Sequence, residues 1–296
     1  MSEKTECGTC SKQDCAAAKK RPDENDRDFQ ERQSLAKNLC GIKRKILVLS
    51  GKGGVGKSTV SINLAAALAM EGFKTGLLDI DIHGPSIPFV FKSGKDKIEH
   101  KKDGRIIPPE VMSGLKVMSV GFFLEDQSQA LIWRGPMKMS AIKQFLSDVQ
   151  WGELDFMIVD CPPGTGDEPL SVCQLMSDID GAVVVTTPQN MALADVRKSI
   201  TFCEQLNIPV IGIVENMSGF KCPCCGNVTD IFEKDGGKNL SEETGIPFLG
   251  KIPIEPGIVK ASEDEKTFVG IAGNSETGKA FMSIIDNIRK NLNEKQ

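Results

Sequence analysis

The sequence has little of what nucleic-acid-binding and membrane proteins are built from. Tyrosine is absent, aromatic residues make up 5% of the 296 residues, and histidine occurs twice. Few aromatic side chains leave few platforms on which bases stack, and a net charge of −4 supplies no basic surface for phosphate backbones. Apolar runs stay shorter than the roughly 20 residues that cross a bilayer. We therefore expect no nucleic-acid partner and no stable membrane association.

Cysteine, in contrast, is abundant, with ten residues. The polar N-terminus lacks the apolar stretch of a secretion signal, so we expect a cytoplasmic protein, in which thiols stay reduced. Scattered positions are Cys40, Cys161, Cys173 and Cys203, whereas Cys7, Cys10 and Cys15 form one cluster and Cys222, Cys224 and Cys225 another. In a reducing compartment, such clusters indicate metal sites before disulfides.

The chain divides into a polar arm and one globular domain. Residues 1–43 are rich in charge and poor in large apolar residues, which predicts a flexible, cysteine-bearing arm with a short helix at 29–39. Residues 44–296 alternate between apolar runs and helical patterns, with a lysine-rich, mobile excursion expected at 89–105. Strands are expected at 45–50, 74–80, 115–120, 154–160, 181–187, 208–214 and 247–250, and helices at 58–71, 137–149, 169–176, 192–205, 230–243 and 275–293. The alternation predicts an α/β fold with a doubly wound, mostly parallel sheet.

A phosphate-binding loop organises this domain. The apolar run 45–50 leads into Gly51-Lys-Gly-Gly-Val-Gly-Lys-Ser58, which fits G-x-x-x-x-G-K-[ST] between a predicted strand and a predicted helix. Glycines let backbone N–H groups turn toward phosphate oxygens, and the helix adds its positive N-terminal end. In such loops the lysine bridges the β- and γ-phosphates and the hydroxyl binds Mg²⁺. The candidate nucleotide-binding residues are Gly51, Lys52, Gly53, Gly54, Val55, Gly56, Lys57, Ser58 and Thr59, with Lys57 also catalytic and Ser58 also a magnesium ligand.

Carboxylates follow two further predicted strands. The second strand ends in Leu77-Leu-Asp-Ile-Asp81, and the fourth ends in Phe156-Met-Ile-Val-Asp160 before Cys-Pro-Pro-Gly-Thr-Gly-Asp167. Ligands of open α/β sheets lie beyond the carboxyl ends of the strands, so we expect these carboxylates near the phosphates. Asp160 fits the Walker B carboxylate that holds Mg²⁺. The proline- and glycine-rich stretch after it fits a switch II segment, which responds to the γ-phosphate. Asp79 is expected to be structural and His83 a polar loop residue.

Cys222 and Cys225 have C-x2-C spacing, with Cys224 between them. Two thiolates at this spacing bind one metal ion or one edge of an iron–sulfur cluster. A pair is half of a four-ligand set, and dimerisation would complete it around a bridging [4Fe–4S] cluster. A structural zinc shared between subunits and a redox dithiol are the alternatives that the residues leave open.

A second lysine in the loop, in Lys52-Gly-Gly-Val-Gly-Lys57, resembles the deviant Walker A loop of the MinD, ParA and nitrogenase-reductase class. The resemblance implies a homodimer in which Lys52 reaches the nucleotide of the partner subunit. It also implies that Asp81, in a segment like switch I, orients the water that attacks the γ-phosphate. Asn216 corresponds to an asparagine that hydrogen-bonds adenine, which favours ATP as the nucleotide.

Five motifs occur together and in order: Lys52-Gly-Gly-Val-Gly-Lys57, Asp81-Ile-His-Gly-Pro-Ser86, Trp133-Arg-Gly-Pro-Met137, Asp160-Cys-Pro-Pro-Gly-Thr-Gly-Asp167 and Asn216-Met-Ser-Gly-Phe-Lys-Cys-Pro-Cys-Cys225. The chain thus resembles the Mrp/ApbC/Nbp-type family of iron–sulfur cluster carrier ATPases over residues 40–290. The resemblance implies ATP hydrolysis with Mg²⁺ and a labile [4Fe–4S] cluster held between subunits by Cys222 and Cys225. It also implies the iron–sulfur assembly machinery and apo iron–sulfur proteins, the recipients of the cluster, as partners.

The arm resembles that of eukaryotic-type members, which hold a second cluster on four N-terminal cysteines. Here the spacing is C-x2-C-x4-C and the upstream cysteine is missing, so Cys7, Cys10 and Cys15 need Cys40 or an external ligand as the fourth. Two other functions stay open. One is a MinD/ParA-like positioning ATPase, anchored by its amphipathic last helix. The other is a nitrogenase-reductase-like electron donor with cluster ligands near Cys161.

Overall fold

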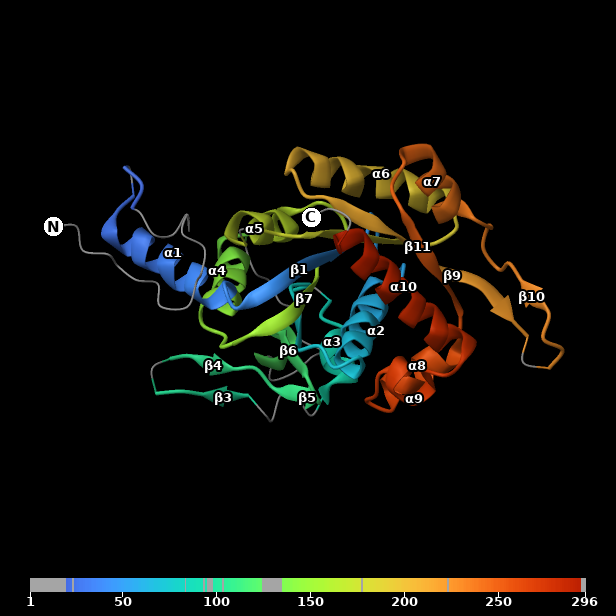
Figure 1. The fold of residues 1–296 in the computed structure, drawn as a ribbon, viewed down its shortest axis with the longest axis horizontal. Coiled ribbons are helices and arrows are strands. Elements are labelled where there is room, and N and C mark those ends of the chain that lie inside the picture. Colours follow the sequence, from blue (N-terminus) through green and yellow to red (C-terminus); the bar gives the residue numbers. More distant parts are fainter. Residues whose placement is uncertain are drawn as a thin grey trace.

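The computed structural model describes residues 20–22, 24–82, 84–92, 94, 98–102, 104–123, 135–176, 178–222 and 224–293, without the side chains of 190–192. These residues form an α/β fold around one twisted central sheet (Figure 1). The predicted doubly wound, mostly parallel architecture is confirmed. The N-terminal cysteines Cys7, Cys10 and Cys15 lie outside the described residues, as do His83, Trp133 and Arg134.

The central sheet has nine strands in the described part of the chain, in the order β10-β9-β8-β1-β7-β2-β6-β5, with β11 paired to β9. All pairings are parallel except those of the edge strands β5 and β10. The strands are β1 (Ile42–Leu49), β2 (Thr75–Asp79), β5 (Glu110–Met112), β6 (Leu115–Ser119), β7 (Leu154–Asp160), β8 (Gly181–Thr186), β9 (Val210–Lys221), β10 (Val228–Thr229) and β11 (Phe248–Ile254). A separate antiparallel pair joins β3 (Glu99–His100) to β4 (Ile106–Ile107).

Helices cover both faces of this sheet. They are α1 (Asp26–Leu39), α2 (Lys57–Met70), α3 (Ile87–Val90), α4 (Gly135–Ser147), α5 (Asp167–Leu175), α6 (Asn190–Gln205), α7 (Gly236–Thr244), α8 (Pro256–Glu263), α9 (Phe268–Ala272) and α10 (Glu276–Asn293), with a 3₁₀ turn at Val120–Phe123. Figure 1 shows α6 and α7 on one side of β8, β9 and β11, and α2 and α10 on the other. Covered on both faces, the central strands are apolar throughout, as parallel strands are: every residue of β2 and β8 is buried.

The register of the central strands brings the candidate carboxylates together. Val48 of β1 and Asp79 of β2 both pair with Asp160 of β7. Because these strands run parallel, their carboxyl ends share one edge of the sheet, where the phosphate-binding loop leaves β1. The order of the strands therefore builds the site predicted from the sequence.

Helix α1 lies inside the segment expected to be an arm. It begins at the N-cap Asn25, whose side chain accepts a hydrogen bond from the Asp28 N–H. Its Leu35 and Leu39 are buried, and it packs against α4. The boundary at residue 43 stays a prediction, but this half of the expected arm contributes apolar side chains to the core of the globular domain.

Two elements differ most from their predicted bounds. The strand expected at 208–214 continues to Lys221, so Asn216 lies within β9 and not after it. The helix expected at 230–243 begins only at Gly236. Residues 230–235 form an irregular segment because they follow β10 and must turn the chain back to the sheet before α7 starts. Within the expected excursion at 89–105, the described residues include β3, which the sequence pattern did not reveal.

The amphipathic α10 does not offer its apolar face to a bilayer. Its Phe281, Ile284, Ile285 and Ile288 are buried, and the helix contacts β11 and α2. A membrane anchor needs that face free, so the packing of α10 argues against the anchored positioning ATPase. Within the described residues, no helix has the length and apolar character required to traverse a bilayer.

Candidate functional site

The phosphate-binding loop lies between β1 and α2, as predicted. Gly56 is the N-cap of α2 and has φ +78°, a left-handed conformation that L side chains rarely adopt. A Cβ at Gly56 would also lie 2.2 Å from Nδ2 of Asn216. A Cβ at Gly51 would lie 2.2 Å from the Asp195 backbone of α6. These two glycines are therefore required by close approach of other elements, whereas a Cβ at Gly54 would meet nothing within 4 Å.

Lys57, Ser58 and Asp160 form a buried polar cluster under this loop. Lys57 Nζ lies 2.7 Å from Asp160 Oδ1, and the Ser58 hydroxyl donates to Asp160 Oδ2 at 2.5 Å. Lys57 and Asp160 are 6% and 0% exposed. Burial lowers the pKa of Lys57, but the charge of Asp160 and the hydrogen bond to it outweigh burial and leave the pKa raised. A hydroxyl and a carboxylate in contact are the oxygen donors that Mg²⁺ prefers, so the pair fits a magnesium site.

Ser61 is a member of this cluster that sequence reasoning missed. Its hydroxyl lies 2.7 Å from Asp160 Oδ1 and 3.1 Å from the carbonyl of Lys57, and its side chain is fully buried. Its position four residues after Lys57 on α2 is the available signal, because residues i and i+4 share a helix face. Asp160 therefore accepts hydrogen bonds on both of its carboxylate oxygens.

Asp79 and Asp81 occupy different environments. Asp79 is fully buried, accepting hydrogen bonds from the Ser119 hydroxyl (2.8 Å) and the Asp81 N–H (3.0 Å). Burial raises the pKa of Asp79 to about 8, with the charge of Asp160 adding to the effect. Asp81 is half-buried, accepts from the Gly84 N–H at 3.2 Å, and is close enough to Lys57 to raise the pKa of that lysine. Asp81 is thus the carboxylate placed at the rim of the site.

The segment after Asp160 is tied to the phosphate-binding loop and to α4. The Gly164 N–H donates to the Ser50 carbonyl at 2.8 Å. Glu168, in the first turn of α5, pairs with Lys138 of α4 at 2.7 Å, and both side chains are nearly buried. The sequence did not reveal this ion pair, which connects the end of the predicted switch II to a helix outside the nucleotide site.

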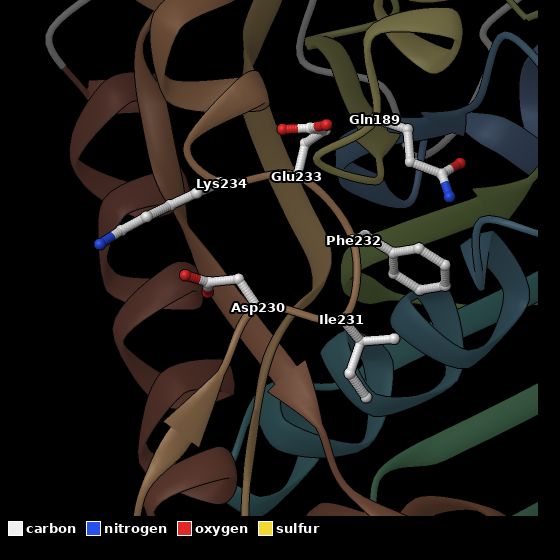
Figure 2. Close-up of a pocket in the computed structure, with 6 residues that line it drawn as sticks. All are labelled: Gln189, Asp230, Ile231, Phe232, Glu233 and Lys234. Carbon is white, nitrogen blue, oxygen red and sulfur yellow. The ribbon is translucent and has the colours of Figure 1, made fainter.

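Lys52, the second lysine of the loop, is half-buried and reaches Gln189 Oε1 at 3.3 Å. Gln189 borders a pocket of about 460 Å³, which residues 230–234 line from the other side (Figure 2). Those residues belong to the irregular segment between the cysteine-bearing hairpin and α7. Gln189, which Lys52 contacts, therefore lies across this pocket from the chain that leaves the cysteine hairpin.

Asn216 contacts the phosphate-binding loop. Its Nδ2 donates to the Val55 carbonyl at 2.8 Å, and the residue is 5% exposed. The role in binding adenine stays a prediction. The contact to Val55, made across 161 positions of sequence, was not foreseen.

The cysteine pair lies on a hairpin at the end of β9. The Cys222 N–H donates to the Asn227 carbonyl and the Gly226 N–H to the Cys222 carbonyl, both at 2.9 Å, and β10 then pairs antiparallel with β9. The N–H groups of Cys225 and Cys224 point to the Cys222 sulfur and lower the pKa of that thiol. A thiol with a lowered pKa on a partly exposed turn is suited to binding metal.

Three of the four scattered cysteines are unlike this pair. Cys161 is fully buried, and burial raises its pKa well above the usual value; burial also raises the pKa of Cys173 to about 11 and that of Cys203 to about 12. Inert, buried thiols are poor cluster ligands. The environment of Cys161 therefore argues against the electron-donor alternative.

A family model supports the same interpretation of the chain. The model, described as a ParA-type NUBPL iron-transfer P-loop NTPase, matches residues 41–289. The match takes in the phosphate-binding loop, both carboxylate strands and the cysteine hairpin.

Relatives match over most of the chain. The iron–sulfur cluster carrier protein of Methanocaldococcus jannaschii is 46% identical over 292 residues, which are 98% of this chain and 97% of the relative. The cytosolic Fe–S cluster assembly factor CFD1 of Saccharomyces cerevisiae is 47% identical over 264 residues, or 86% of this chain and 90% of the relative.

Solved structures share the fold. A nucleotide-binding protein from Archaeoglobus fulgidus, in complex with ADP, is 40% identical with a TM-score of 0.71, and the match covers 80% of this chain and 92% of that chain. The cell-division ATPase MinD of Pyrococcus furiosus has a TM-score of 0.57 at 21% identity, covering 84% and 99%. At that identity, the second likeness indicates the fold alone.

Proposed function

This chain belongs to the family of ParA-type NUBPL iron-transfer P-loop NTPases, and we propose that it carries a [4Fe–4S] cluster to apo iron–sulfur proteins. The cluster, which is the cargo, is held between two copies of the chain, and ATP is bound and hydrolysed during the cycle. Donors in the assembly machinery load it. The names of the relatives support this proposal. The yeast relative is named a cytosolic factor, which supports a cytoplasmic location for this chain.

The observation that carries the proposal is the cysteine hairpin. Cys222 is half-buried with a lowered pKa, and Cys225 is exposed three residues later on the same turn. A [4Fe–4S] cluster takes four thiolates, of which this turn offers a pair. If the twofold axis of a dimer passed beside the hairpin, it would bring the two pairs together, because residues near such an axis lie close to their copies in the partner.

We assign the hydrolysis of ATP to the buried cluster under the phosphate-binding loop. Lys57 would neutralise the β- and γ-phosphates, and Asp81 would orient the attacking water. Ser58 and Asp160 would hold Mg²⁺, which supplies charge neutralisation of the phosphates when bound. Lys57 and Ser58 both contact Asp160, at 2.7 and 2.5 Å, which supports assigning the three residues to one site. Lys52 is assigned to the nucleotide of the partner subunit.

Anaerobic reconstitution with iron and sulfide tests the cargo site. Cys222→Ala with Cys225→Ala should lose bound iron, acid-labile sulfide and the brown absorbance, since both copies then lack their pair and none of the four thiolates remains. Cys224→Ala, in the same turn, is the matched control and should keep them. Iron and sulfide counts per dimer, together with a Mössbauer spectrum, distinguish a [4Fe–4S] cluster from a shared zinc ion. A double variant that still loads would contradict the proposal.

A further inference from the structure

Strand β9 contains Asn216, which contacts the phosphate-binding loop, and leads into the cysteine hairpin. Asn216 lies in β9 and Cys222 directly follows the last residue of that strand, six positions later, in the sequence Asn216-Met-Ser-Gly-Phe-Lys-Cys222. We propose that Asn216 is a positioning residue that couples the nucleotide state of the phosphate-binding loop to the cysteine hairpin. This inference rests on the proposed function, because it states how ATP acts on the cluster.

The contact at the nucleotide end is buried and close. Asn216 Nδ2 donates to the Val55 carbonyl at 2.8 Å, and Gly56, the next residue of the loop, leaves no room for a side chain beside that amide. The Met217 side chain also reaches Gly56, with Cε 3.7 Å from the position of a Cβ there. The loop therefore cannot change the direction of the Val55–Gly56 peptide without disturbing two consecutive residues of β9.

The strand has an irregularity at this contact. Met217 has φ +57° and Gly219 φ +78°, and the register with β11 shifts between Ile252 and Ile254. A non-glycine residue in the left-handed region is strained and persists only where its surroundings fix it. A strand bulge of this kind is a place where a strand can be re-aimed. Here it lies between the loop contact and the cysteines.

The backbone beside the bulge is held on its other side. The carboxylate of Glu215, which is fully buried, accepts hydrogen bonds from the Ser218 hydroxyl and the Gly237 N–H, both at 2.6 Å. Beyond it, Phe220 pairs with both β10 and β11. Because Glu215 holds the strand before Asn216, a movement at Asn216 is directed the other way, through the paired backbone of Phe220 towards Cys222. This is a contiguous path of hydrogen bonds and paired backbone, as coupling requires.

The direct test measures how ATP changes the rate at which iron leaves the loaded protein for a chelator. In the wild type we expect a difference within the roughly 5- to 150-fold range that is typical of coupled sites. In Asn216→Ala, loaded with the same amount of iron and assayed at saturating ATP, the ratio should fall to about one. Asn291→Ala is the matched control: its amide donates to the Ile211 carbonyl of the same strand at 3.1 Å, away from the loop, and its ratio should stay that of the wild type.

Four outcomes decide between the explanations. A ratio preserved in Asn216→Ala at saturating ATP, with only the KM for ATP raised, would assign Asn216 to adenine recognition and overturn the coupling. If the ratio fell equally in Asn291→Ala, the loss would come from a general weakening of the strand, and the coupling through Asn216 would also be overturned. A ratio of one in the wild type would overturn it directly. A wild type that takes up no cluster would refute the proposed function.

Hydrogen exchange of the cluster-free wild type tests the coupling without any variant or cargo. We expect amides of residues 217–229 to change their exchange rate when ATP and Mg²⁺ are added, together with those of residues 51–58. A hairpin that is unchanged while the loop becomes protected would overturn the inference. Because no cluster is present, this result is independent of the cargo assignment.

Discussion

The pairing of Lys57 with Asp160 predicts how the nucleotide-free protein responds to loss of one charge. The two groups are 2.7 Å apart and almost fully buried. Each therefore neutralises the charge of the other in a place where water cannot solvate it. Lys57→Met leaves the Asp160 carboxylate in that environment without its ammonium partner. Asp160→Asn leaves the Lys57 ammonium without its carboxylate partner, and the double variant removes both charges.

The expected magnitudes follow from what remains around each group. Removing one partner of a buried ion pair typically costs about 3–5 kcal/mol. In Lys57→Met, Asp160 keeps the hydroxyls of Ser58 and Ser61 as donors, so we expect the lower end, about 3 kcal/mol. In the double variant no unpaired charge remains, and we expect a loss of about 1 kcal/mol. Asp160→Asn also removes one partner of the pair and should cost about 3–5 kcal/mol, so the coupling energy of the cycle should be about 5 kcal/mol or more.

Urea denaturation of the nucleotide-free wild type, both single variants and the double variant measures this cycle. It is done in the absence of Mg²⁺, because a bound ion would replace the lysine as the partner of Asp160. All variants of Lys57 should also lose ATP hydrolysis. The reasoning is refuted if the double variant is as unstable as the sum of the singles, since the two charges would then not interact in the folded protein.

Three further predictions concern stability. The pKa of Asp79, about 8, is raised from 3.8, so the folded protein keeps a proton that the unfolded chain releases. The free energy of unfolding should fall between about pH 4 and 8, by at most about 1.4 kcal/mol per pH unit, and Asp79→Asn should flatten this dependence in urea melts. Gly56→Ala should cost about 3 kcal/mol in urea melts, since left-handed strain and the contact with Asn216 add. Leu39→Ala should cost about 2–3 kcal/mol in thermal or urea melts if α1 is part of the domain core.

Each of these has a comparison that can contradict it. For Asp79, parallel stability curves of wild type and variant between pH 5 and 8 would mean that the carboxyl is ionised in the folded protein. Gly54 has the same φ of +78°, but a Cβ there meets nothing within 4 Å. Equal losses of stability in Gly54→Ala and Gly56→Ala would therefore mean that the contact with Asn216 contributes nothing. Val259→Ala, at a residue 66% exposed, is the reference for Leu39, and an equally small effect would leave α1 outside the core.

Much of the site was predictable because its signals are local. The phosphate-binding loop needs glycines, a lysine and a hydroxyl within eight consecutive residues, and the strand and helix around it are adjacent in sequence. Asp160 could be placed because an apolar run ends at it, and parallel strands end at one edge of a sheet. The C-x2-C pair is likewise contained in a single turn.

Other features could not be predicted, because their partners lie far away in sequence. The apolar pattern ended the sixth strand at 214, whereas pairing with β11 and β10 carries β9 on to Lys221. The helix expected from 230 starts at Gly236, where the Cβ of any other residue would lie 2.1 Å from the Pro188 carbonyl oxygen. Charge composition suggested that residues 1–43 form an arm, but two leucines of α1 are buried and this helix packs against α4.

The sequence by itself determined the fold class, the nucleotide loop and the thiolate pair, since each follows from residue types at short, fixed spacing. Only the tertiary structure decided what those parts touch: Lys57 and Ser61 on Asp160, Glu168 on Lys138, and Asn216 on Val55. The physical reason is that a hydrogen bond or ion pair depends on the approach of groups in space. Packing of the sheet and its helices sets that approach, and residues up to 161 positions apart take part in it.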